Sequence, residues 1–155
     1  MRIGLFEPEI PHNTGAVARL CLAAGASLHL IGRLGFRLDD PRAKRPGLDY
    51  FEHVELHRHD SLDAFAMLAP AEDWLCFSAH GVRRYDEIVY PPTATLLFGS
   101  ETRGLPDRLA SDPARSVRIP ILDPRARCLN LSTAVAIALW EARRQQGFPE
   151  TGDER

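Results

Sequence analysis

The residues best suited to chemistry fall into three short clusters, and the first of them begins at Asn13. If residues 13–19 are helical, Gly15 and Ala16 lie one turn before Arg19, on the same side of the helix. Such small neighbours leave the guanidinium uncrowded, and its fork of donors suits a phosphate or a ribose. A surface arginine in an ordinary helix would show the same spacing, so this cluster alone leaves both interpretations open.

The second cluster is the stretch 96–105, in which an apolar run is followed by Gly99, Glu101 and Gly104. Ligands of open α/β sheets bind at the carboxyl ends of strands, and glycines let backbone and ligand approach closely. The stretch is not a Walker loop, because no Gly-Lys-Ser/Thr follows it. Residues 7–12 likewise lack the glycines of a dinucleotide-binding fingerprint. A plain turn remains the alternative interpretation.

The third cluster runs from Arg118 to Ser132 and combines a strand end, a loop rich in proline and arginine, and a helix start. The first turn of a helix leaves N–H groups without intrahelical partners, so such a site can hold a polar small molecule largely with main chain. Asn130 and Ser132 are the side chains placed to cap the helix or to contact a ligand. A capped C-terminal helix without a ligand is the alternative.

These clusters need an alternation of strands and helices, which the apolar patterning supplies. Strands are expected at 3–6, 28–31, 54–57, 74–78, 94–98 and 117–119. Helices are expected at 14–24, 62–68, 106–109 and 131–146, with Asn13 as the N-cap of the first. The connection 32–50 is polar and rich in arginine, with room for one short helix. This order predicts an α/β fold with an open parallel sheet and a right-handed first crossover.

The expected last helix is apolar on more than one face. Leu131, Val135 and Ala138 belong to one stripe, whereas Ile137 and Trp140 occupy other faces. A helix that is apolar nearly all round is buried on more than one side. We therefore predict a homodimer, although small residues also permit close helix packing within one chain.

Composition is that of an ordinary globular protein, with 155 residues, 45% hydrophobic and 26% charged. We expect one domain over residues 1–149 and a flexible tail at 150–155. No apolar run approaches the roughly 20 residues that span a bilayer, and the N-terminus is too short and too acidic for a signal peptide. Cys21, Cys76 and Cys128 are far apart and form no Cys-x-x-Cys pair. This usage indicates reduced thiols, a cytoplasmic protein and no metal site.

The formal net charge of −2 argues against a protein that coats nucleic acid indiscriminately. Positive charge is nevertheless concentrated in the first half of the chain, where it could meet phosphates or form a solvated surface. The residues concerned are Arg33, Arg37, Arg42, Lys44, Arg45 and Arg58.

Taken together and in this order, the motifs are similar to those of the SPOUT superfamily of methyltransferases, and within it to the tRNA wobble-nucleotide ribose 2′-O-methyltransferases. The likeness runs from about residue 3 to residue 149, essentially the whole chain. It is carried by Glu7-Pro8-Glu9-Ile10-Pro11 with Asn13-Thr14-Gly15 and Arg19-Leu20-Cys21, by Gly35-Phe36 with Asp39-Asp40 and Arg45-x-Gly47-Leu48-Asp49-Tyr50, by Phe98-Gly99-x-Glu101-Thr102-x-Gly104-Leu105-Pro106, and by Arg118-Ile119-Pro120 with Asn130-Leu131-Ser132.

The resemblance implies an α/β knot fold, which is a parallel sheet flanked by helices with a C-terminal trefoil knot. The knot would form the pocket for S-adenosyl-L-methionine, in a homodimer whose knots pack together. The implied cofactor contacts, mostly through backbone, are Phe77, Gly99, Ile119, Cys128 and Leu129. Cys128 stands where family members often carry Ser, and Ser100 where they often have Pro. Main-chain contacts would tolerate both departures.

The implied reaction is attack of a ribose 2′-hydroxyl, in the anticodon stem-loop of tRNA, on the sulfonium methyl. The family ties this role to the motif arginine, here Arg19. A guanidinium is a poor base, so we expect Arg19 to bind the ribose and its phosphate and to stabilise alkoxide character. Glu101 is expected to orient Arg19, while the other members of the implied catalytic group are Asn13, Asn130 and Ser132.

Substrate choice is less constrained by these motifs than the chemistry. The candidates for gripping tRNA are Arg33, Arg42, Lys44 and Arg45. Alternative interpretations are a related 2′-O-methyltransferase acting on ribosomal RNA or another tRNA position, and a catalytically silent knotted module that only binds RNA.

Overall fold

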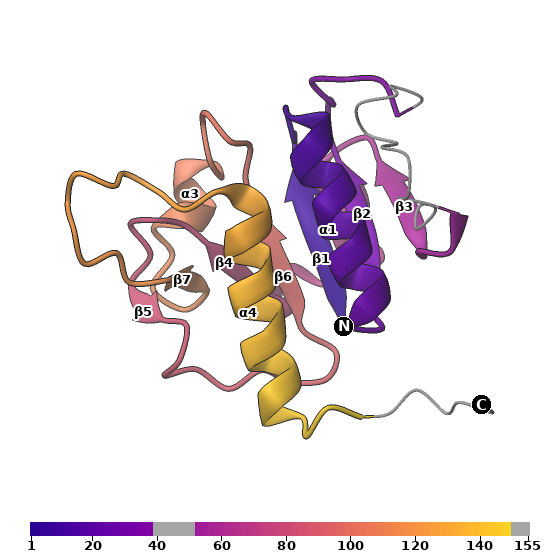
Figure 1. The fold of residues 1–155 in the computed structure, drawn as a ribbon. Coiled ribbons are helices and arrows are strands. Elements are labelled where there is room, and N and C mark those ends of the chain that lie inside the picture. The colour runs from indigo at the N-terminus through magenta and orange to yellow at the C-terminus, as the bar shows by residue number, and fades with distance from the viewer. Residues whose placement is uncertain (39–51, 150–155) are drawn as a thin grey trace.

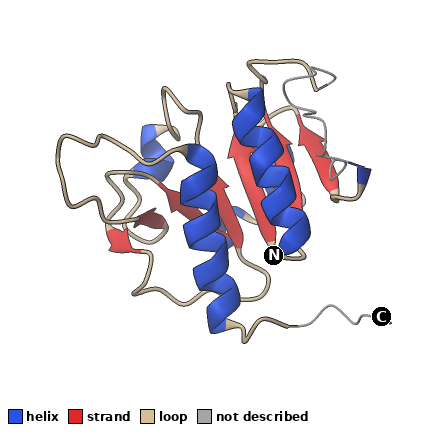
Figure 2. Ribbon diagram, viewed as in Figure 1, coloured by secondary structure: helices blue, strands red, loops and turns tan. Residues whose placement is uncertain are grey.

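The computed structural model describes residues 1–38 and 52–149, which form a parallel sheet covered by helices on both faces (Figures 1 and 2). The seven strands lie in the order β3-β2-β1-β6-β4-β7-β5, and every neighbouring pair is parallel. The strands are β1 (Arg2–Phe6), β2 (Ser27–Ile31), β3 (Leu56–His59), β4 (Trp74–Phe77), β5 (Arg83–Arg84), β6 (Thr95–Phe98) and β7 (Ser116–Arg118). The helices are α1 (Pro11–Ala23), α2 (Leu62–Ala66), the short 3-10 helix η2 (Ala71–Asp73), α3 (Asp107–Ala110) and α4 (Leu131–Gln145).

The expected α/β class and most of the expected elements are confirmed. β6 is buried along its whole length between β1 and β4, as its apolar sequence predicts. Two details differ. β3 begins two residues later than expected, and β5 was not expected at all. Because β5 consists of two exposed arginines at the edge of the sheet, it has no apolar pattern that sequence reasoning could detect.

Helix α1 begins earlier than predicted, so the expectation that Asn13 is its N-cap is wrong. The N-cap is Ile10, and Pro11 occupies the first turn. Proline suits that position because its fixed φ is helical and its missing N–H would have had no intrahelical partner. Asn13 therefore lies inside the helix, where it is only 3% exposed. The helix ends as expected, with Gly25 just beyond it at a φ of 60°.

Helices α1 and α4 lie side by side over one face of the sheet, as Figure 1 shows. Val17 and Cys21 of α1 and Val135 and Leu139 of α4 are fully buried in the core beneath them. The opposite face is covered by α2 and α3, in a second apolar cluster that contains Phe65. The two layers hold the carboxyl ends of the central strands rigidly, and the loops that follow those strands form the site described below.

Two glycines mark places where backbone approaches backbone at very short range. A Cβ on Gly81 would lie 2.3 Å from the carbonyl carbon of Val117, and one on Gly99 would lie 1.9 Å from that of Gly104, within the turn after β6. No larger residue fits at either position. The threading of the C-terminal segment into a knot stays a prediction. None of the helices in the described part of the chain has the length and apolar character needed to span a bilayer.

Candidate functional site

A cavity of about 720 Å³ opens where β4, β6 and β7 end and α4 begins. This volume is in the range of small-molecule sites. The rings of Phe77 and Phe98 stack with their centroids 4.7 Å apart and give the cavity an apolar wall. All five residues expected to contact the cofactor line this one cavity, namely Phe77, Gly99, Ile119, Cys128 and Leu129.

Four of the five residues expected to take part in catalysis form one hydrogen-bonded chain beside the cavity. Asn13 Nδ2 donates to Glu101 Oε1 at 2.8 Å, and Asn130 Nδ2 donates to Asn13 Oδ1 at 3.0 Å. Ser132 Oγ donates to Asn130 Oδ1 at 2.7 Å. Glu101, Asn13 and Asn130 line the cavity, whereas Ser132 lies behind them. These hydrogen bonds join α1, the loop after β6 and the start of α4, which are far apart in sequence.

The carboxylate at one end fixes the orientation of both amides. Glu101 can only accept when ionised, so Asn13 must turn its NH₂ group toward it and its oxygen toward Asn130. Asn130 must then present its NH₂ group to Asn13 and its oxygen to the first turn of α4. That oxygen accepts from the backbone N–H groups of Ser132 at 2.9 Å and Thr133 at 3.4 Å. Asn130 thus caps the helix, as expected.

Glu101 also satisfies the backbone N–H groups that precede α1. Its carboxylate accepts from Glu9 N at 2.8 Å and from Ile10 N at 3.2 Å, so it supplies the cap that no side chain of α1 provides. A negative charge at this end also opposes the positive pole of the helix. Arg19 lies six residues further along α1 than Asn13 and faces another side of the helix, and its expected contact with Glu101 stays a prediction.

Of the remaining predicted residues, the structure describes Arg19 and Arg33, and neither lines the cavity. Arg19 is exposed on α1 and does not line the cavity of its own chain. Arg33 is exposed in the loop after β2. Arg42, Lys44 and Arg45 lie outside the described residues, as do the possible short helix in the 32–50 connection and the tail at 150–155. Across residues 1–38 and 52–149, no group of three or more His, Cys, Asp or Glu side chains could hold a metal ion.

The two departures from the family pattern fit the site. Ser100 is buried, and its Oγ accepts from Arg103 N at 3.2 Å, which supports the turn that ends at Gly104. Cys128 is exposed at the cavity. Cys21 and Cys76 are buried elsewhere, and burial raises the pKa of both thiols to about 12.

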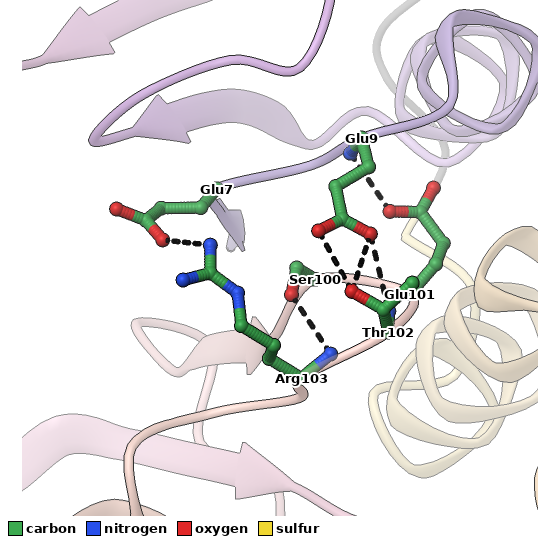
Figure 3. A network of polar contacts seen from close by, with 6 residues as sticks. All are labelled: Glu7, Glu9, Ser100, Glu101, Thr102 and Arg103. Carbon is green, nitrogen blue, oxygen red and sulfur yellow. Dashed lines mark hydrogen bonds and ion pairs between the residues drawn. The ribbon is translucent and has the colours of Figure 1, made fainter.

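Sequence reasoning missed a set of contacts between the segment before α1 and the loop after β6, drawn in Figure 3. Glu9 accepts hydrogen bonds from Thr102, and Glu7 forms an ion pair with Arg103 at 2.7 Å. The signal available in the sequence was the pair of glutamates around Pro8. Nothing in their spacing indicates a partner some ninety residues away.

The comparisons with known proteins agree with this fold. Residues 1–140 match the SpoU rRNA Methylase family. The chain therefore belongs to that family, and the resemblance on the sequence motifs is confirmed. A tRNA (cytidine(34)-2′-O)-methyltransferase of Burkholderia pseudomallei is 46% identical over 151 residues, which are 93% of this chain and 94% of the relative.

Solved structures lead to the same family. One that concerns the 2-OH methylation of C/U34 on tRNA superposes with a TM-score of 0.86 at 44% identity, and the match covers 94% of this chain and 95% of the other. The AdoMet-bound rRNA methyltransferase of Sinorhizobium meliloti superposes with a TM-score of 0.80 at 28% identity. That match covers 92% of this chain and 55% of the other.

Proposed function

We propose that this protein transfers a methyl group from S-adenosyl-L-methionine to the ribose 2′-hydroxyl of nucleotide 34, the wobble position of tRNA. The observation that carries the proposal is the hydrogen-bonded chain Glu101–Asn13–Asn130 at a cavity of suitable size. Relatives that are over 40% identical along nearly the whole chain are named tRNA (cytidine(34)-2′-O)-methyltransferases. A tRNA substrate is also consistent with the expected location of the protein in the cytoplasm.

The cavity suits the proposed cofactor in shape and in chemistry. The apolar wall of Phe77 and Phe98 can face the adenine ring, and the backbone around Gly99 and Leu129 offers main-chain donors and acceptors. When bound, the cofactor supplies a methyl group on a positively charged sulfur. The carboxylate of Glu101 at the cavity favours a ligand with that charge.

The chain's own residues then have to bind and orient the ribose. Transfer forms a bond between the 2′-oxygen and the methyl carbon, breaks the carbon–sulfur bond so that a neutral thioether leaves, and releases the hydroxyl proton to solvent water. Arg19 binds the ribose and its phosphate and stabilises the negative charge that develops on the 2′-oxygen. Asn13 and Asn130 form a fixed surface against which the sugar lies, because neither amide can turn while Glu101 is ionised.

Arg19 reaches a cavity only if a second chain brings it there, so we infer a homodimer with shared sites. In one chain Arg19 is exposed and outside the cavity. The outer side of α4 keeps apolar surface, since Trp140 is 40% exposed. Packing of this side against another copy would bury that surface and place the arginine of one chain at the cavity of its partner.

Subunit mixing tests the shared site. Arg19→Ala and Asn13→Ala homodimers should each be nearly inactive. Heterodimers formed by refolding the two together contain one site with both residues intact. About a quarter of the wild-type activity should then return in a one-to-one mixture. No recovery, or a monomer in sedimentation, contradicts the shared site.

The target nucleotide is tested directly. Purified protein, tritiated S-adenosyl-L-methionine and unmodified tRNA transcripts should give one 2′-O-methylated nucleoside, which nuclease mapping and mass spectrometry place at position 34. Ribosomal RNA in the same assay tests the second candidate, which the family's description and the Sinorhizobium meliloti structure favour. Methylation of ribosomal RNA alone would replace the proposed substrate, and binding of RNA without methylation would identify a silent module.

The proposed grip on the anticodon stem-loop involves Arg33, with Arg42, Lys44 and Arg45 as further candidates outside the described residues. Arg33→Glu should weaken tRNA binding and reduce its dependence on salt, because each lost phosphate contact lowers the slope of log K against log salt by about one. An unchanged slope would remove Arg33 from the interface.

A further inference from the structure

The segment before α1 and the loop after β6 are joined by hydrogen bonds in which each segment accepts from the other, as Figure 3 shows. Thr102 Oγ1 lies 2.8 Å from each carboxylate oxygen of Glu9, and Thr102 N donates to Glu9 Oε2 at 3.2 Å. In return, Glu9 N donates to Glu101 Oε2 at 2.8 Å. Because Glu101 and Thr102 are adjacent in sequence, these contacts close a ring around the Glu101 side chain.

This ring limits how the Glu101 carboxylate can move. One of its oxygens accepts from the backbone of Glu9, and the backbone that carries it is held through Thr102 by the Glu9 carboxylate. The other oxygen is then directed at Asn13 and Ile10. Glu9 itself does not line the cavity, whereas Glu101 and Thr102 do.

The segment that carries Glu9 would not hold this shape by itself. Glu7, two residues earlier, has a φ of 49°, a left-handed conformation that costs a residue with a side chain about 1 kcal/mol or more. Its carboxylate pairs with Arg103, whose side chain is 69% exposed. So exposed an ion pair contributes little. The Glu9–Thr102 contact is exposed as well, but it joins the two segments through both a backbone N–H group and a hydroxyl.

We propose that Glu9 is a positioning residue of the methyl-transfer site. Acting through Thr102, its carboxylate fixes the loop 99–104 and the Glu101 carboxylate, and so sets both the cavity wall and the orientation of the Asn13 amide. The inference rests on the proposed function, since it assigns Glu9 to the site at which S-adenosyl-L-methionine and ribose are to meet.

The test compares Glu9→Gln and Thr102→Val with two matched variants. Thr102→Ser keeps the hydroxyl, and Glu72→Gln neutralises an exposed carboxylate on η2, outside the cavity. Calorimetry with S-adenosyl-L-methionine and turnover with tRNA are measured for each. Glu9→Gln and Thr102→Val should each lower kcat/KM about fivefold, the factor for about one hydrogen bond. Thr102→Ser should recover most of that loss, and Glu72→Gln should resemble the wild type.

A double variant separates positioning from general loss of stability. If Glu9 acts through Thr102, Glu9→Gln combined with Thr102→Val lowers kcat/KM no further than either change alone. A double variant whose loss of kcat/KM is the product of the two single losses would overturn the proposal. A Thr102→Ser variant as impaired as Thr102→Val would overturn it as well.

The backbone amide of Ile10 gives a readout that needs neither ligand nor activity. Ile10 N donates to Glu101 Oε1, so its hydrogen exchange should accelerate in both Glu9→Gln and Thr102→Val while the amides of β6 keep wild-type rates. A wild-type protein that binds no S-adenosyl-L-methionine would overturn the proposed function but leave this measurement decisive for Glu9. Unchanged exchange at Ile10 in both variants would overturn the positioning role.

Discussion

Asn13→Asp replaces one amide NH₂ group by an oxygen and leaves the shape of the side chain nearly unchanged. The wild-type NH₂ group donates to Glu101 Oε1 at 2.8 Å, and Asn13 is 3% exposed. The replacement therefore puts two carboxyl groups in contact at a partly buried place. Such a pair cannot ionise fully, and it keeps one shared proton.

The size of the effect follows from that distance. Two negative charges 2.8 Å apart repel by about 6 kcal/mol at an effective dielectric constant of about 20. This repulsion raises the pKa of the introduced carboxyl above that of a free aspartate. The group binds a proton more tightly in the folded than in the unfolded state. Stability is therefore present below the unfolded pKa and is lost as the pH rises toward the folded pKa, at about 1.4 kcal/mol per pH unit for one proton.

Urea denaturation of Asn13→Asp at several pH values, beside the wild type, measures this slope. Asn130→Asp is the matched control. Its new oxygen would face the side-chain oxygen of Asn13 and not a carboxylate. Its charge would lie at the N-terminus of α4, where a carboxylate is favourable. Asn130→Asp should show little pH dependence. Adding Glu101→Gln to Asn13→Asp should remove the slope, because the new amide can donate to the new carboxylate. A destabilised Asn13→Asp with no pH dependence would refute the assigned amide orientation.

Three further outcomes are expected. Arg19→Ala should leave the affinity for S-adenosyl-L-methionine nearly unchanged in calorimetry and lower turnover by orders of magnitude, and equal loss of both would contradict its role. Maleimide should label Cys128 alone in the native protein, more slowly with the cofactor present, whereas labelling of the buried Cys21 or Cys76 at a similar rate would contradict the fold. His29 is 1% exposed and burial lowers its pKa to about 4, so the free energy of unfolding should fall by about 2 kcal/mol between pH 7 and 5, and His29→Gln should reduce this slope.

The fold was largely predictable because its strands and helices have strong local signals. Apolar runs mark β1, β2, β4 and β6, and the Ser61 hydroxyl caps α2 as its sequence indicates. The start of α1 was misplaced because two rules competed at neighbouring positions. Asn13 is a common N-cap residue, but Pro11 is equally well suited to the first turn and Glu101 supplies the missing cap.

The sequence motifs named residues that line the cavity, but not the contacts between them. The five cavity residues were placed by the motifs, whereas the partner of each polar side chain lies on another segment. Glu101 meets Asn13, 88 positions earlier, and Thr102 meets Glu9, 93 positions earlier. Local periodicity carries no information on such pairs, because the strand order brings β1 beside β6 only in the folded sheet.

The position of Arg19 shows what the fold of one chain cannot supply. Glu101, Asn13 and Asn130 form a rigid floor whose polar groups satisfy one another, so few remain to stabilise charge on a ribose oxygen. A cation is needed above that floor, and Arg19 faces another side of the same helix that carries Asn13. One helix cannot direct both residues into one cavity. The proposed homodimer resolves this geometry, and it would link assembly to catalysis, because a chain without its partner would also lack the partner's arginine.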